Sequence, residues 1–541
     1  MTAPLHLANA RLSGRDGLWT IHVLKGRIAS ITPTPTPTSA PTSAPTSAQQ
    51  SWDSAAPGIG PEKRSPRVPQ PLGGELVDLG GRFVLPGLWD AHTHLTQWAI
   101  SRRRLDVSAA TSPGHAAQLV RAGLDDPASA PQQGRPLIGF GFRWATWSSA
   151  PTAAVLDTVA GDAPVVLVAG DLHSAWASTA GLRFLGLEHP TGLLREEEWM
   201  RVSERLVAMR DDVADALVRD AAAAAATRGV VGVVDFEMAD NLTSWRRRGA
   251  AGWDGLRVRA AVWENHLDAT VAEGLHDGDP LLPSRLSAPG RPGARPGPDS
   301  LLTQGPLKVI TDGSLNTRTA YCFAPYPGLA GPDAHGHLAV GPERLVPLLG
   351  RARDAGLRAA VHAIGDQANA LALDAFAASG VRGSIEHAQL LRPDDVARFA
   401  ELGVVASVQP EHAMDDRDVT AQLWPGRDGR CFPLASLLAA GVRLTLGSDA
   451  PVAPLDPWVA IAAAVTRSRD GRKPWHPEQR IDVPAALAAS VDRRPLALAV
   501  GMPADLAVLD DDPFDPATNL RTLPVAATVV GGRFTHRALG R

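Results

Sequence analysis

From residue 229 onward the chain alternates short apolar segments with amphipathic helical stretches, and this alternation restricts the possible fold more than any other feature. The apolar segments lie at 229–235, 258–263, 307–310, 357–362, 383–387, 404–409 and 442–449. The run from Phe83 to Leu88 adds an eighth buried strand. Eight strands separated by helices predict an α/β fold, a (β/α)8 TIM barrel whose site lies at the carboxyl ends of the strands.

Polar side chains collect at the ends of these predicted strands. They are His92, His94, Lys308, His362, His387 and Asp449. Side chains two residues apart on a strand point the same way, so the imidazoles of His92 and His94 face one point. Strand ends converge in a barrel, and imidazole and carboxylate groups are ligands of Zn²⁺ and similar ions. The sequence therefore predicts a site for one or two divalent metal ions, with zinc preferred.

Lys308 stands in an apolar strand of a chain that rarely uses lysine. Only four of its 53 Lys and Arg residues are lysine. A neutral lysine amine that takes up carbon dioxide becomes a carbamate, a carboxylate-like group able to bridge two metal ions, and an arginine offers no such group. Two interpretations remain open. Either Lys308 is carbamylated, or it is unmodified and pairs with Asp312 or with a substrate carboxylate.

The chain ends and one long internal segment fall outside the barrel pattern. Short alternating β segments predict a small β-sandwich domain formed by 1–84 and 496–541. Within it, the Pro/Thr/Ser/Ala tract at 32–71 has too few apolar residues to pack and is predicted to be a disordered insertion. The barrel is then expected at 85–99 and 226–495. Residues 100–225 are expected to form an inserted α/β subdomain that covers the active site.

Composition restricts the partners. Lys and Arg total 53, Asp and Glu total 57, and the net charge is −4, so nothing indicates nucleic acid. Two cysteines are too few for a disulfide scaffold and fit a reducing compartment. The amino terminus does not resemble a signal peptide, and no uncharged apolar run reaches membrane-spanning length. We expect a cytoplasmic protein that acts on a small molecule and does not bind a membrane; a homodimer is a possible assembly.

Six further side chains are candidates for substrate binding. Two lie in the expected insertion and four follow barrel strands: His173, Trp176, Asp312, Tyr321, Tyr326 and Gln409. For the histidine and the aromatic residues, core packing or loop anchoring is the competing interpretation. For Gln409, the competing interpretation is that it caps a helix.

Longer motifs surround these residues. They are Leu85 to His94, Gly170 to Trp176, Leu307 to Ser314, Val361 to Asp366, Ile385 to Ala388, Gln409-Pro410, Gly447 to Pro451 and Ala504 to Leu509. Together they resemble the amidohydrolase superfamily, specifically amidohydrolase family 3, the group similar to N-substituted formamide deformylase. This resemblance covers nearly the whole chain and implies a metal-dependent hydrolase of carbon–nitrogen bonds other than peptide bonds. Three features depart from the family pattern: the Pro/Thr tract, Asn316 in place of a glycine, and a shortened segment at 490–502.

Two residues are assigned catalytic roles. A divalent ion lowers the pKa of bound water towards about 7 and polarises a carbonyl group. Asp449 is expected to take the proton of that water and to pass it to the leaving amine. His387, or His362, is expected to stabilise the developing oxyanion if it does not bind a second ion.

The number of metal ions stays open, as does the reaction. In a two-ion site, one ion is held by His92, His94 and Asp449 and the other by His362 and His387, with carbamylated Lys308 as the bridge. In a one-ion site, the ligands are His92, His94, His362 and Asp449, and Glu386 or His387 moves protons. The favoured substrate is a small amide, an N-formyl or an N-acyl compound. The alternatives are a deaminase or a cyclic amide hydrolase acting on a lactam or imidazolone, and a non-catalytic binding module.

Overall fold

The computed structural model describes residues 3–34, 73–126, 135–207, 209–282, 300–492 and 494–540. The tract predicted to be disordered at 32–71 lies outside the described residues except for its first three positions. Thr32 and Pro33 belong to a strand that ends at Pro33, so the ordered β structure continues slightly further than the composition indicated.

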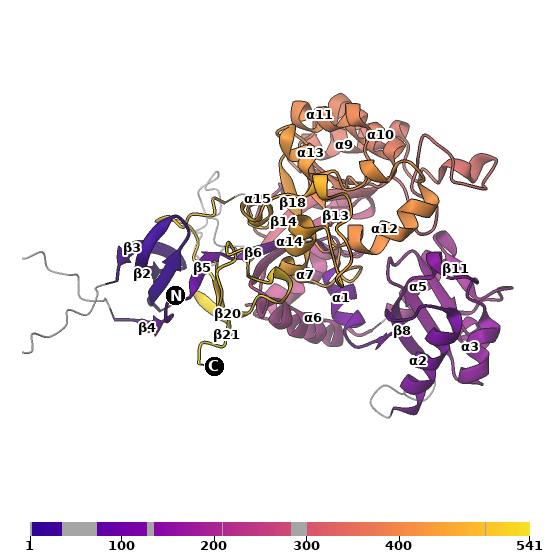
Figure 1. The fold of residues 1–541 in the computed structure, drawn as a ribbon, viewed down its shortest axis with the longest axis horizontal. Helices are drawn as coiled ribbons and strands as arrows, with labels where there is room; N and C mark the ends of the chain where they lie inside the picture. The colour runs from indigo at the N-terminus through magenta and orange to yellow at the C-terminus, as the bar shows by residue number, and fades with distance from the viewer. Residues whose placement is uncertain are drawn as a thin grey trace, which may run out of the picture.

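A barrel of parallel strands forms the centre of the molecule and confirms the predicted TIM barrel (Figure 1). In the described part of the chain it has eight strands, each parallel to its neighbour, which are β6 (Leu88–Thr93), β12 (Val230–Asp235), β13 (Arg257–Trp263), β14 (Leu302–Ile310), β15 (Ala359–Ala363), β16 (Gly383–His387), β17 (Val405–Val408) and β18 (Leu444–Leu446). Strands such as β15 and β17 are buried along their whole length, because helices cover the outside of a parallel sheet and side chains fill its inside.

Helices separate the barrel strands along the chain. They are α1 (Leu95–Ser101), α6 (Asp211–Ala226), α7 (Asn241–Ala250), α8 (Glu264–Ala272), α9 (Pro342–Asp354), α10 (Asp366–Ser379), α11 (Pro393–Leu402), α12 (His412–Leu423), α13 (Leu434–Ala439), α14 (Pro457–Thr466) and α15 (Val483–Ala489). Helix α6 falls within the segment expected to be an insertion, but its apolar face, including Val218 and Ala222, packs into the barrel beside Val230 and Trp245. Helix α6 therefore packs as part of the barrel, so the second barrel segment starts before the expected boundary at residue 226.

The first barrel strand is shorter than the sequence suggested. The apolar run expected to be one strand, Phe83 to Leu88, is divided at Gly87: β5 (Phe83–Pro86) joins the terminal sheet, and β6 starts at Leu88. A side chain at position 87 would approach Val231 Cγ1 to 2.1 Å, so only glycine fits where the backbone passes from one sheet to the other. As a result, His92 lies inside β6 and His94 directly after it.

Both chain ends build a second sheet beside the barrel, as predicted. Its described strands are β1 (Leu5–Leu12), β2 (Arg15–Leu24), β3 (Arg27–Pro33), β4 (Glu75–Asp78), β5, β19 (Leu506–Leu509), β20 (Val525–Val530) and β21 (Arg533–Arg537). Leu7, Ile21, Leu506 and Val529 are fully buried in its core. Asp505, next to β19, forms a buried ion pair with Arg257 of β13, at 2.8 Å, and thereby connects this sheet to the barrel.

A third sheet lies between β6 and β12 along the chain. Its strands are β7 (Leu105–Asp106), β8 (Leu137–Phe142), β9 (Val165–Ala169), β10 (Ser174–Ala177) and β11 (Leu193–Arg195), accompanied by α2 (Pro113–Asp125), α3 (Ala153–Ala160), α4 (Thr179–Leu185) and α5 (Glu197–Val207). In Figure 1 this insertion stands beside the barrel, at the lower right. Among the described helices, none combines the length and apolar character needed to cross a membrane.

Candidate metal centre

The closure of the barrel brings three predicted ligands together. The Asp449 N–H donates to the carbonyl of His92 at 2.7 Å, and the His94 N–H donates to the carbonyl of Ala450 at 2.8 Å. These bonds join the end of the last strand to the end of the first. One Asp449 carboxylate oxygen lies 3.5 Å from His92 Nε2 and 3.3 Å from His94 Nε2. Such a cluster of two imidazoles and a carboxylate suits a divalent metal ion.

A second group of potential ligands shares Asp449. Ring nitrogens of His387 and His412 and a carboxylate oxygen of Asp449 all lie within 4.8 Å of one another. His387 ends β16, and His412 is the first residue of α12, the helix after β17. His412 was not among the predicted ligands. The available signal was its position just beyond the seventh strand, the rule by which the other ligands were found.

Several imidazoles around Asp449 carry a buried ring nitrogen that makes no hydrogen bond to the described part of the chain. Within the described residues, His94 Nδ1, His387 Nδ1 and His412 Nε2 are buried without a hydrogen-bond partner. Leaving a buried polar atom unpaired costs about 1–3 kcal/mol, which coordination would offset at a nitrogen that faces the ion. His94 Nδ1 is not such a nitrogen, because His94 faces Asp449 with Nε2. Burial lowers the pKa of His92 and of His387 well below the ordinary histidine value, so both rings are neutral near pH 7, the form that binds metals.

The backbone at two of these positions is unusual. Asp449 has φ of 55° and His387 has φ of 71°, the left-handed region that non-glycine residues seldom adopt. Conformations of this kind cost about 1–3 kcal/mol each and are found mainly at functional sites. Both residues are therefore held by the surrounding structure in a conformation that their local sequence does not favour.

Carboxylates outside the cluster orient the His92 ring and the strand ends. The Glu386 carboxylate lies 2.7 Å from His92 Nδ1, which leaves Nε2 directed at Asp449, and Ser384 Oγ donates to Glu386 at 2.5 Å. Asp90 accepts the N–H groups of His92 and Ser448, so one carboxylate ties β6 to the end of β18. Carboxylates of this kind fix which imidazole nitrogen faces a metal ion.

Lys308 reaches the same place from β14. Its side chain is buried, and Nζ lies 3.3 Å from His92 Nε2 and 4.3 Å from the centre of the Phe236 ring. Burial lowers the pKa of Lys308 to about 8, which raises the share of neutral amine. The sequence left open an ion pair between Lys308 and Asp312. The described residues do not form this pair, since Lys308 lies beside His92 and Asp312 beside His362.

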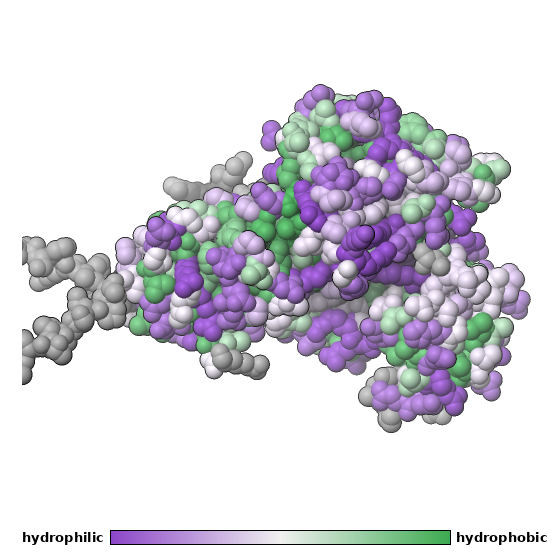
Figure 2. Space-filling model, in the orientation of Figure 1, coloured by the Kyte–Doolittle hydropathy of each residue, from purple (hydrophilic) through white to green (hydrophobic). Residues whose placement is uncertain are grey.

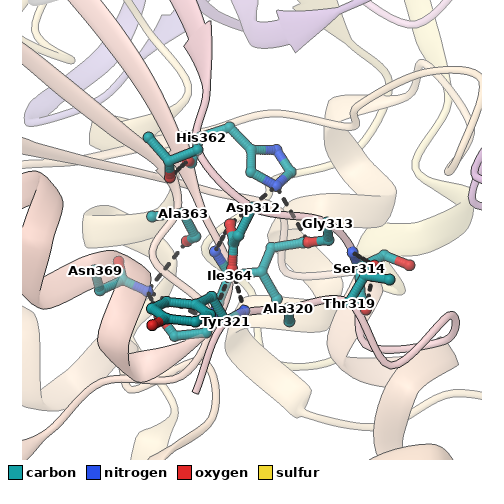
Figure 3. A network of polar contacts seen from close by, with 12 residues as sticks. Asp312, Gly313, Ser314, Thr319, Ala320, Tyr321, His362, Ala363, Ile364 and Asn369 are labelled. Carbon is teal, nitrogen blue, oxygen red and sulfur yellow. Dashed lines mark hydrogen bonds and ion pairs between the residues drawn. The ribbon is translucent and has the colours of Figure 1, made fainter. Parts of the chain in front are cut away.

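Asp312 instead organises the loops after two barrel strands. Figure 3 shows its carboxylate beside Tyr321 and Ile364. It accepts the N–H groups of Tyr321, Ile364 and Gly365 at 2.9–3.0 Å. One oxygen lies 3.4 Å from His362 Nε2. Burial raises the pKa of Asp312 to about 7. Asp312 and Tyr321 thus hold the loop that follows β15, the strand that carries His362, and neither side chain lines the cavity over the donor cluster.

His362 lies beside the second group of ligands. Its ring centre is 4.5 Å from that of His387, and burial lowers its pKa to about 3. His362 Nε2 faces the carbonyl of Gly313 at 3.4 Å. The structure thus brings all six predicted ligands to one end of the barrel and adds His412 to them.

Three other candidates for substrate binding lie away from the wall of the cavity. Trp176 is fully buried in the core of the insertion against Phe142 and Trp147, and Tyr326 is buried with its hydroxyl donating to the Ala320 carbonyl. Gln409 is buried behind the ligands, with Nε2 3.4 Å from His92 Nδ1. These side chains do not line the cavity over the donor cluster. In each case the packing interpretation, or a supporting role behind the ligands, describes the residue better.

The donor cluster opens into a large cavity between the barrel and the insertion. Its volume is about 680 Å³, and His173 of the insertion lines it together with Leu172, Trp199 and Met200. Figure 2 shows hydrophilic residues gathered on the surface where the barrel meets the insertion. His173 pairs with Glu196 at 2.9 Å, and although burial alone would lower the pKa of His173, Glu196 raises it to about 9. The cavity therefore offers a cationic imidazole opposite the metal ligands.

A parallel barrel with this donor set defines a metal-dependent hydrolase, and the comparisons agree. The amidohydrolase family model matches residues 75–536, so the chain belongs to the amidohydrolase family.

Individual relatives are more distant. Protein LONG AFTER FAR-RED 3 of Arabidopsis thaliana is 29% identical over 84% of this chain and 83% of its own. N-substituted formamide deformylase of Arthrobacter pascens is 26% identical over 86% of this chain and 90% of its own. Among solved structures, an uncharacterized metal-dependent hydrolase from Pyrococcus horikoshii superposes with a TM-score of 0.71 at 24% identity, covering 96% of this chain and 100% of that one. At that identity the likeness shows a shared fold.

Proposed function

We propose that the protein hydrolyses the carbon–nitrogen bond of a small amide, an N-formyl or an N-acyl compound, and does not act on peptide bonds. The observation that carries this proposal is the cluster of buried, partly unpaired imidazoles around Asp449 at the floor of a large cavity. The similarity to N-substituted formamide deformylase supports an N-formyl or related substrate.

The residues present fit one or two zinc ions. His92, His94 and Asp449 would hold the first ion, and His387 and His412, with His362 beside them, would hold the second. Lys308, buried next to His92, would bridge the two as a carbamate, since a neutral amine can take up carbon dioxide. When bound, such ions lower the pKa of water to about 7 and polarise the amide carbonyl. Mass analysis of the intact protein for one added carbon dioxide tests the carbamate.

Asp449 is the residue that moves the proton. Burial alone would raise its pKa, but the hydrogen bond with His94 and the nearby charges lower it, so the carboxylate stays ionised and acts as a base. It accepts a proton from the attacking water and donates it to the leaving nitrogen, which departs as a neutral amine. His173, across the cavity, orients the substrate carbonyl.

The test is turnover by metal-loaded protein on a panel of N-formyl, N-acyl and cyclic amides, beside a chelated control. Amine release from linear amides is expected. Ring opening or ammonia release would instead support a cyclic amide hydrolase or a deaminase, and no turnover on any arm would leave only a binding role.

Asp449→Asn provides the matched variant. It keeps an oxygen ligand but removes the base, so turnover should fall by about 10²–10⁴-fold while much of the metal stays bound. Metal content and kcat are measured on the same sample. Undiminished turnover in this variant would exclude the assigned role.

A further inference from the structure

Arg104 is a guanidinium that lines the active-site cavity without a counter-charge. Its Nε atom is buried and has no hydrogen-bond partner among the described residues. In the same part of the chain, no carboxylate oxygen lies within 4.0 Å of its side-chain nitrogens. Burial lowers its pKa to about 10, and no neighbouring acid opposes that effect. Arg104 as a whole is half-buried, and a guanidinium withdrawn from water in this way without an acid partner is stabilised when an anion joins it.

The other arginines of the cavity are neutralised by the fold. Arg143 pairs with Asp415 at 3.0 Å, and Arg247 and Arg248 both pair with Asp215, at 2.8 and 2.7 Å. Their charges are used to hold helices and loops together. Arg104 differs from them because the described residues supply it with no partner.

Carboxylates that line the cavity are also occupied. Asp211 pairs with Arg247 at 3.0 Å, Glu237 accepts two N–H groups of Gln97, and Asp416 accepts an N–H group of Gln389 at 2.8 Å. If one of these carboxylates moved to pair with Arg104, it would have to give up its present contact. An anion that enters with the substrate has no such cost.

The separation between Arg104 and the donor cluster limits how far the anionic group of a substrate can lie from its amide. Helix α1 separates His94 from Arg104 along the chain, and its seven residues rise about 10 Å. The apolar side chains of Leu172, Trp199 and Met200 line the same cavity. The cavity thus combines a hydrolytic centre, an apolar wall and a free guanidinium.

We propose that Arg104 binds a carboxylate of the substrate, so that the amide cleaved here is an N-formyl or N-acyl derivative of an amino acid with an apolar body. A guanidinium presents parallel N–H donors that match the two oxygens of a carboxylate, and such charge-assisted pairs are among the stronger hydrogen bonds. This inference rests on the proposed function, because it names the substrate class of the same site.

Binding of matched acids and amides tests the inference separately from turnover. Calorimetry on the full chain compares N-formylleucine with N-formylleucinamide, and N-formyl-6-aminohexanoate with its carboxamide, so that two spacings are sampled. We expect at least one acid to bind about 10- to 100-fold more tightly than its amide. Arg104→Gln should abolish this preference, and Arg104→Lys should retain part of it. Arg103→Gln is the control, since Arg103 is 64% exposed and pairs with Asp220 on the surface.

Each outcome decides the matter. Equal binding of acid and amide to the unmodified protein overturns the inference, and this comparison holds even if Arg104→Gln fails to fold. A preference that survives in Arg104→Gln also overturns it. An Arg104-dependent preference without hydrolysis of any amide would refute the proposed function and keep the carboxylate site. Hydrolysis of neutral amides without tighter binding of the acids would support the proposed function and refute the carboxylate site.

Discussion

The His92 ring illustrates how one side chain depends on its neighbours. Its Nδ1 is engaged by Glu386 at 2.7 Å, and its Nε2 faces Asp449 and Lys308. A neutral imidazole that presents only one nitrogen to a metal ion needs such a partner on the other nitrogen. Glu386 is therefore a positioning residue.

Replacing Glu386 should weaken metal binding without removing a ligand. In Glu386→Gln the amide holds the His92 ring less firmly, and metal affinity should fall by about 10- to 100-fold. Competition with a chelator of known affinity measures the change. Ser384→Ala, which keeps the contact between Glu386 and His92, should stay close to the unmodified protein, and an equal loss in both variants would contradict this role.

His412 tests whether the second group of ligands binds an ion. Its Nε2 is unpaired and lies 4.0 Å from an Asp449 oxygen. For a site that holds two ions, His412→Ala should reduce the metal content to one ion per chain, because His92 and His94 are untouched. Elemental analysis of the purified protein gives the ratio. His476→Ala, at a histidine that does not line the cavity, is the control, and an unchanged ratio in His412→Ala would exclude this ligand.

At the scale of the element, the end of β18 is fitted to the end of β6. Gly447 is the critical position, because a Cβ atom there would lie 2.7 Å from the His92 nitrogen and 2.8 Å from its Cβ. The close approach lets Asp449 bond to the His92 carbonyl at 2.7 Å. The position of Asp449 beside His92 thus depends on the absence of a side chain at Gly447, two residues before it.

Gly447→Ala should therefore damage the metal centre more than the fold. The new methyl group must push His92 and Asp449 apart, and we expect metal affinity to fall at least tenfold with a loss of stability of about 1–3 kcal/mol. Chelator competition and denaturant unfolding measure the two effects. Gly350→Ala is the control, because a Cβ atom at Gly350 meets nothing within 4 Å. Full metal affinity in Gly447→Ala would contradict the argument.

The elements and ligands could be predicted to different degrees for physical reasons. Strand–helix alternation predicted the barrel, because buried parallel strands must be continuously apolar. The break at Gly87 was missed, since an apolar run looks the same whether it feeds one sheet or two. Trp176 and Tyr326 were candidates for the cavity but lie in apolar cores, since aromatic residues serve cores and pockets alike. His412 was missed because it opens a helix three residues after Gln409, where the strand-end rule was no longer applied.

At the scale of the whole molecule, one buried carboxylate joins the terminal sheet to the barrel. Asp505 is fully buried and pairs with Arg257 at 2.8 Å and with Arg494 at 2.9 Å. It also accepts the N–H group of Gly531. Removing one partner from a buried ion pair leaves the other charge uncompensated.

Asp505→Asn should therefore destabilise the protein by about 3–5 kcal/mol. Denaturant unfolding at neutral pH measures the loss. Asp510→Asn, at a carboxylate that is 39% exposed in its pair with Arg82, should change stability by less than about 1 kcal/mol. Similar effects of the two substitutions would show that the buried pair is not a main connection.

Acid should act on the same contact. Burial alone would raise the pKa of Asp505, but Arg257 and Arg494 lower it below the ordinary value of about 3.9. A carboxylate with a lowered pKa stabilises the fold above its unfolded pKa and loses that contribution as the pH falls through its folded pKa. The stability difference between the protein and Asp505→Asn should thus shrink below about pH 4. A constant difference across the acid range would refute the assignment.

The bonds that close the barrel also set an order of events during synthesis. His92 and His94 leave the ribosome early, whereas Asp449 emerges only when nearly the entire barrel has been translated. A nascent chain therefore carries two imidazoles without their carboxylate, and tight capture of a metal ion must wait until the last strand docks against the first.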